Sequence, residues 1–108
     1  MCSSDLILIL TTLPDDRADA IARTLVDERL AACVNVHAPM RSTYRWKGIV
    51  ERDAERQIVI KTTSDRRAAL EARLRELHPY ELPEFVVLNA DASAAYARWV
   101  GDETRGPA

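Results

Sequence analysis

The residues from Leu6 to Leu10 constrain the fold more than any other part of the chain. Successive side chains of a strand point to opposite faces, so this uninterrupted aliphatic run makes a strand that is apolar on both faces. Such a strand belongs in the middle of a sheet, where both of its faces and both of its edges are covered. Thr11 and Thr12 continue the β-branched run. We therefore predict a central strand over residues 6–12.

The hydrophobic period then changes several times and predicts the remaining elements. After the helix-start residues Pro14, Asp15 and Asp16, apolar side chains recur every three or four positions as far as Leu30, which is typical of an amphipathic helix. The sequence next predicts a strand that starts at Cys33, bends at Pro39 and runs to Trp46, followed by a strand over Gln57–Thr62. It then predicts a helix that is capped by Ser64 or Asp65 and stopped by Pro79. A strand over Glu84–Asn89 and a helix over Ala92–Val100 complete the predicted elements.

The order strand, helix, strand, strand, helix, strand predicts the fold. With right-handed crossovers it gives an α+β, ferredoxin-like βαββαβ sandwich, with both helices on one face and a short C-terminal helix added. The first and third strands should be central. We expect a single domain over residues 1–108, with an ordered core at about 5–101 and a loose tail at 102–108.

The second and third strands form a long hairpin that predicts self-association. An arm of roughly ten residues spans about 33 Å, which is long for a domain whose radius of gyration is about 13 Å. Ser42, Tyr44 and Trp46 share one face of the first arm, and exposed aromatic side chains on an edge strand need a partner. The alternative is that both aromatic rings fold back onto their own subunit or onto the terminal helix.

Charge and glycine content narrow the function classes. The net charge of -2 does not favour nucleic-acid binding, which needs a positive surface. The three glycines are too scattered to form a phosphate-binding loop. No serine lies in a nucleophile-elbow sequence, and we expect no enzyme activity.

The sequence also predicts a location. Leu6 to Leu10 is too short to cross a bilayer, and no signal-peptide pattern precedes it, so we expect no membrane partner. Cys2 and Cys33 are far apart and form neither a disulfide framework nor a thiolate metal pair. A reducing compartment, the cytoplasm, fits best.

Several short segments, taken together, resemble the divalent-cation tolerance protein CutA family. They cover nearly the whole chain, and their order and separation are more specific than any single segment. The matching segments are Thr12-Leu13-Pro14-Asp15, Arg29 to Asn35, Ser42-x-Tyr44-x-Trp46-x-Gly48-x-Val50 with Glu55 downstream, Ile60-Lys61-Thr62, and His78-Pro79-Tyr80-Glu81-x-Pro83-Glu84.

The resemblance implies a cytoplasmic homotrimer linked with metal tolerance, in which the hairpins pair across subunit boundaries. Our candidate interface residues are Tyr44, Trp46, Tyr80 and Trp99. Some members of the family bind copper.

The copper ligands of those members are only partly kept in this chain. The resemblance implies a cysteine at the end of the first strand and a pair of histidines before Pro79, but these positions hold Thr11 and, for the first histidine, Leu77. Only His78 remains. Glu81 and Glu84 are close enough in sequence to complete a harder site for a divalent ion, copper or zinc. The alternative is that His78 caps the free carbonyls at the end of the second helix.

Two functions of different class therefore stay open. One is a metal-responsive trimer that binds a divalent cation weakly. The other is a trimeric sensor or scaffold that holds a small ligand or a partner protein at clefts between subunits, as the PII signalling proteins of similar fold do.

Overall fold

The computed structural model describes residues 5–106 and has a five-stranded antiparallel sheet. The main part of the sheet has the order β2-β4-β1-β5. The strands are β1 (Leu6–Leu13), β2 (Cys33–Val36), β3 (Met40–Trp46), β4 (Ile49–Thr63) and β5 (Val86–Asn89), and the helices are α1 (Ala18–Asp27), α2 (Arg67–Leu77) and α3 (Ala94–Glu103). The apolar strand β1 is central, between β4 and β5, as its sequence predicts.

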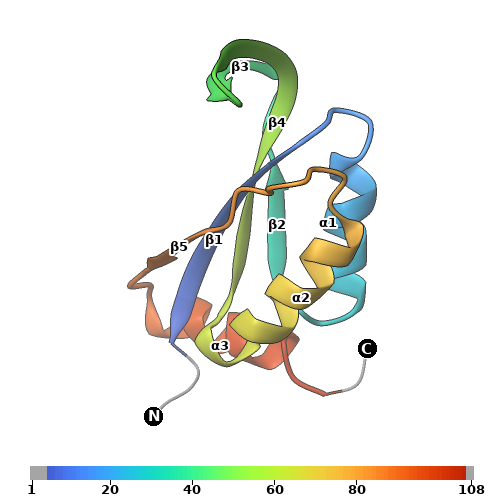
Figure 1. Cartoon of the computed structure of the whole chain (residues 1–108). Coiled ribbons are helices and arrows are strands. Elements are labelled where there is room, and N and C mark those ends of the chain that lie inside the picture. Colours follow the sequence, from blue (N-terminus) through green and yellow to red (C-terminus); the bar gives the residue numbers. More distant parts are fainter. Residues whose placement is uncertain (1–4, 107–108) are drawn as a thin grey trace.

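Helices α1 and α2 cover one face of this sheet (Figure 1). The alternation along β1 and β4 sends every second aliphatic side chain toward the helices, and the apolar stripes of both helices meet them there. The buried core contains Ile7, Ile9 and Leu13 of β1, Ile58 and Ile60 of β4, Ile21 and Leu25 of α1, and Leu70 and Leu74 of α2. The two-layer sandwich predicted from the element order is confirmed.

Strand β4 is much longer than its hydrophobic pattern predicts. It has 15 residues and begins at Ile49, whereas the apolar pattern begins only near Gln57. Its first half pairs with β3, from Met40 opposite Glu55 to Trp46 opposite Ile49, and its second half pairs with β1 and β2. Residues 51–56 are mostly charged and show no apolar alternation, so the hydrophobic pattern does not predict this half of the strand.

The hairpin is closed by a two-residue turn at Lys47 and Gly48. Their φ angles of 51° and 83° are both positive, the combination that a type I′ hairpin turn requires. The paired strands curl over one end of the sheet (Figure 1), and the subunit is 45 Å long but only 25 Å and 23 Å in the other directions. The predicted projection of the hairpin is therefore confirmed.

Helix α2 begins later in the sequence than predicted. Neither Ser64 nor Asp65 caps α2; they form a short 3-10 helix, Ser64–Arg66, and Arg66 is the N-cap without a side-chain bond. Asp65 instead accepts a hydrogen bond from the Thr63 hydroxyl.

The C-terminal tail is ordered further than predicted. Helix α3 continues to Glu103, and the hydroxyl of the buried Thr104 donates to the carbonyl of Val100 at 3.0 Å. The expected loose tail at 102–108 is thus corrected as far as residue 104, and residues 107–108 lie outside the described part. Cys2 also lies outside it, and Cys33 is a half-buried free thiol. Within residues 5–106, no helix is long and apolar enough to cross a membrane.

Core side chains of the central strand β4 should contribute more to the free energy of unfolding than side chains on the outer surface of the helices. We expect Ile60→Ala to lower the free energy of unfolding by about 2–5 kcal/mol because it opens a cavity in the core. Val26→Ala, on the exposed side of α1, should change it by less than about 0.5 kcal/mol. Denaturant unfolding of both variants at one protein concentration tests this, and equal effects would contradict the assignment of the core.

Candidate functional site

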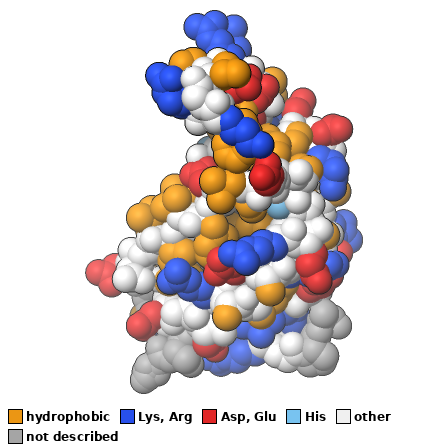
Figure 2. All heavy atoms as spheres, viewed as in Figure 1, with side chains coloured by type: hydrophobic (Ala, Val, Ile, Leu, Met, Phe, Trp, Pro, Cys, Tyr) orange, Lys and Arg blue, Asp and Glu red, His pale blue; other side chains and the backbone are white. Residues whose placement is uncertain are grey.

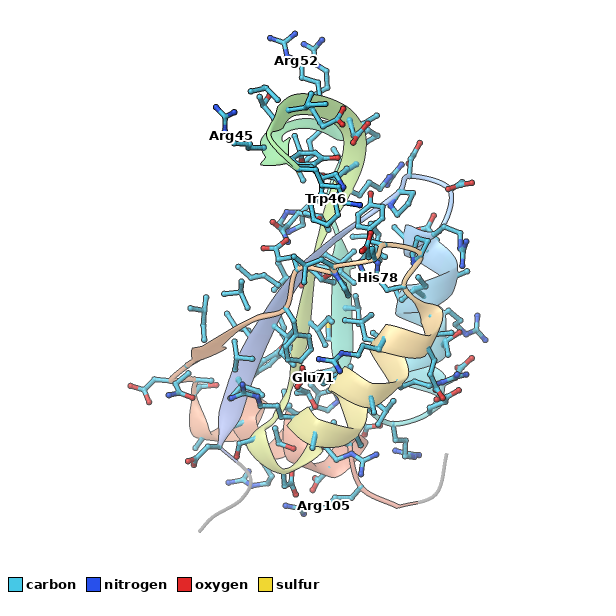
Figure 3. The ribbon with its side chains drawn as sticks, viewed as in Figure 1. Arg45, Trp46, Arg52, Glu71, His78 and Arg105 are labelled. Carbon is cyan, nitrogen blue, oxygen red and sulfur yellow. The ribbon has the colours of Figure 1, made fainter. Side chains whose placement is uncertain are left out.

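A cavity of about 780 Å³ lies where the hairpin leaves the sheet. The hairpin supplies one wall, and the segment that follows α2 supplies the other. The lining residues are Thr12, Ser42, Tyr44, Trp46, Glu55 and the continuous stretch Pro79 to Glu84. In Figure 2, hydrophobic side chains gather beneath the hairpin, and Figure 3 shows Trp46 directed from the hairpin toward the body of the subunit.

The aromatic wall of the cavity follows from the strand period. Ser42, Tyr44 and Trp46 alternate along β3 and all line the cavity, which confirms that they share one face. The Tyr44 hydroxyl donates to the carboxylate of Asp53 on β4, and this bond raises the pKa of Tyr44 to about 12. Both rings therefore point toward their own subunit, although Tyr44 keeps 40% of its surface exposed.

A buried carboxylate ties the two walls together. Glu55 of β4 is only 6% exposed, and its Oε2 accepts a hydrogen bond of 2.6 Å from the Tyr80 hydroxyl. Burial and this bond raise the pKa of Tyr80 well above its usual value, so the phenol stays protonated and remains the donor. Among the described residues, no Lys, Arg or His forms an ion pair with Glu55. The hydrogen bond from Tyr80 is therefore the contact that offsets the burial of this carboxyl group.

Both ring nitrogens of His78 have hydrogen-bond partners. The Tyr80 N–H donates to Nδ1 at 3.2 Å, so Nδ1 is the acceptor and Nε2 carries the proton. Nε2 donates to the carbonyl of Thr12 at 2.8 Å and lies 3.3 Å from the Thr11 hydroxyl. Burial lowers the pKa of His78, against the opposing effects of the Thr12 carbonyl and Glu55. His78 is therefore a neutral, buried residue that joins the end of α2 to β1.

Two of the proposed metal ligands, Glu81 and Glu84, line the cavity, whereas His78 is not among its lining residues. Within residues 5–106, no group of three His, Cys, Asp or Glu side chains is arranged to hold a metal ion. Glu81 is exposed and lies 3.9 Å from the Lys47 ammonium, while Glu84 is half-buried on the cavity wall. Thr11 does lie beside His78, and Leu77 packs against the hydrophobic core. Metal binding by His78, Glu81 and Glu84 stays a prediction that a single subunit does not support.

The four candidate interface residues lie at two places. Tyr44, Trp46 and Tyr80 line the cavity, whereas Trp99 is on α3 with its ring 5.6 Å from that of Tyr96. Glu55 is not predicted as a site residue from the sequence because it stands among charged residues, where no hydrophobic pattern shows which face of the strand it occupies. Its position downstream of the Tyr44-x-Trp46 segment, which belongs to the family resemblance, is the sequence signal that could have indicated it.

Comparison with known proteins decides the family. The family model described as CutA1 divalent ion tolerance protein matches residues 7–103. The chain belongs to the CutA family. It is 41% identical over 99 residues to the divalent-cation tolerance protein CutA of Thermus thermophilus, a match that covers 90% of this chain and 96% of that protein.

Solved CutA structures have the same fold. The CutA crystal structure from Xylella fastidiosa is 42% identical with a TM-score of 0.88, and the match covers 94% of this chain and 99% of that one. The PII-like protein CutA from Nostoc sp. PCC 7120 is also 42% identical with a TM-score of 0.88, over 92% and 97% of the two chains. These matches bear out the ferredoxin-like fold.

The buried His78 should make stability depend on pH. Because its folded-state pKa lies below the unfolded value of about 6.5, the unfolded chain gains protons first as the pH falls, and stability decreases below about pH 6.5. We expect His78→Gln to flatten the change between about pH 7.5 and about pH 5.5. His37→Gln, at an exposed position, should leave it in place. Denaturant unfolding at both pH values measures this, and an unchanged slope in His78→Gln would contradict the buried neutral state.

Proposed function

We propose that this CutA-family chain acts in the tolerance of divalent metal ions as a cytoplasmic homotrimer. The names of its relatives support the role in tolerance. The observation that supports the trimer is an apolar face of the sheet, which no helix of the described chain fully covers.

That face lies opposite α1 and α2. Leu8 and Leu10 of β1 pair with Leu88 and Val86 of β5, so these four side chains project from the same face. Val86 and Leu88 are 42% and 46% exposed. Helix α3 covers only one end of the face, where Val100 packs with Leu6 and Ala32. An antiparallel sheet usually turns polar side chains to water, and an apolar outer face instead suits contact with other copies.

The assembly can be tested at Leu88. We expect Leu88→Glu to break the trimer because it places a charge in the apolar interface, whereas Val26→Glu on α1 should leave the trimer intact. Light scattering coupled to size-exclusion chromatography measures the mass. A wild-type monomer, or a trimer that survives Leu88→Glu, would contradict this interface.

We propose that any divalent cation bound by this chain is held weakly, by carboxylate side chains. Glu81 and Glu84 remain available at the cavity, whereas His78 would have to give up its bond either to Thr12 or to Tyr80 before one of its ring nitrogens could coordinate copper or zinc. The tolerance function then depends little on tight coordination by this chain.

Calorimetric titration with copper and zinc tests this. Chelator-stripped protein should bind either ion only weakly, and Glu81→Gln with Glu84→Gln should weaken binding more than His78→Gln does. Tight binding that disappears in His78→Gln would show instead that His78 is a metal ligand and would overturn the carboxylate proposal.

The cavity favours a second candidate function, a sensor that binds a small ligand. Its volume of about 780 Å³ falls within the roughly 300–1,000 Å³ typical of small-molecule sites. The name of the Nostoc relative, a PII-like protein, agrees with this candidate.

A further inference from the structure

The charged side chains that line the cavity are all acidic. Three acidic side chains line it, Glu55, Glu81 and Glu84, and no Lys or Arg is among its lining residues. Glu55 is almost fully buried, and burying a carboxylate without a nearby positive charge is unfavourable. A cation in the cavity would offset that cost, and an anion would increase it.

The rest of the lining suits an organic cation better than a hydrated metal ion. Tyr44, Trp46 and Tyr80 contribute aromatic rings, and Leu82 and Pro83 contribute apolar surface. Aromatic faces attract ammonium groups, most strongly when the cation carries alkyl groups that shed water easily. Divalent metal ions need several convergent oxygen or nitrogen ligands, an arrangement not found among residues 5–106.

An ammonium group of the chain itself already lies at the edge of this site. The Nζ atom of Lys47 is 5.6 Å from the centre of the Trp46 ring and 3.9 Å from Oε1 of Glu81. One primary ammonium thus contacts both kinds of group that line the cavity, an aromatic face and a carboxylate. Lys47 is itself largely exposed. Within residues 5–106, neither Glu55 nor Glu84 forms an ion pair with a Lys, Arg or His side chain.

We propose that the cavity binds a small organic cation that carries a substituted ammonium group. The ammonium lies against the rings of Trp46 and Tyr80 with Glu55 as its main counter-charge. Lys47 competes for the rim of the same site. This inference rests on the second candidate function, that the cavity holds a small ligand, and it names the chemical class of that ligand.

Trp46 provides a direct signal for the test. The chain has two tryptophans, so a Trp99→Phe background leaves Trp46 as the single tryptophan fluorophore. We would titrate this protein with choline chloride and with 3,3-dimethylbutan-1-ol, the neutral isostere of choline, at constant ionic strength. Choline should change the fluorescence saturably, and the isostere should bind at least about fivefold more weakly because it lacks the cation–π and carboxylate attraction.

Three variants locate the site. Glu55→Gln keeps an acceptor for Tyr80 but removes the charge, and it should weaken choline binding by about fivefold or more. Lys47→Asn removes the competing ammonium while keeping a residue that tolerates positive φ, and it should strengthen binding. Asp91→Asn removes one acidic charge at an exposed position outside the cavity and should have no effect. Circular dichroism of each variant confirms folding.

The outcomes separate this inference from the proposed function. No saturable choline binding by a folded trimer would overturn the inference and leave the trimer in place. Equal binding of choline and its isostere would also overturn it, while supporting a ligand cavity of another chemistry. Equal loss of binding in Glu55→Gln and Asp91→Asn would show a general charge effect and would likewise contradict the assigned site. A wild-type monomer would instead contradict the proposed assembly.

Discussion

Strand β4 connects the two parts of the molecule because it pairs with different strands along its length. Its second half, from Arg56 to Thr63, lies in the core sheet between β1 and β2. Its first half carries the hairpin strand β3 beyond the sandwich. The core therefore fixes the direction of the hairpin, and the curl of the hairpin brings an aromatic wall over the segment that follows α2 (Figure 1). Without the continuous strand, the cavity would have only one wall.

The cavity residues are held by contacts that also stabilise the fold. His78 joins the end of α2 to β1 through the Thr12 carbonyl and receives the Tyr80 N–H, so the backbone of the following segment is fixed at its start. Tyr80 then reaches Glu55 of β4 through its hydroxyl. This chain of hydrogen bonds gives His78 a structural role and joins Tyr80 on one wall of the cavity to Glu55 on the other. The site is accordingly better suited to a ligand than to a metal ion bound by His78.

The sequence predicts most of the fold because hydrophobic period reports burial. It locates β1, both core helices and the apolar half of β4, and the bend at Pro39 divides β2 from β3 as expected. It does not reveal the charged half of β4, which is held by pairing with β3, or the 3-10 helix before α2. At the site, the alternation of side chains along a strand correctly places Tyr44 and Trp46 on one face of β3. Glu55 and Tyr80 are 25 residues apart, and only the tertiary structure brings them together.

The hydrogen bond between Tyr80 and Glu55 is the contact on which this account of the cavity depends. A double-mutant cycle with Tyr80→Phe and Glu55→Met measures it, using the free energy of unfolding of the two single variants and the double variant at one protein concentration. Because the bond is buried and charge-assisted, we predict a coupling energy of about 1 kcal/mol or more. Additive effects would mean that the two walls are not joined in solution, and that the cavity is not a fixed site.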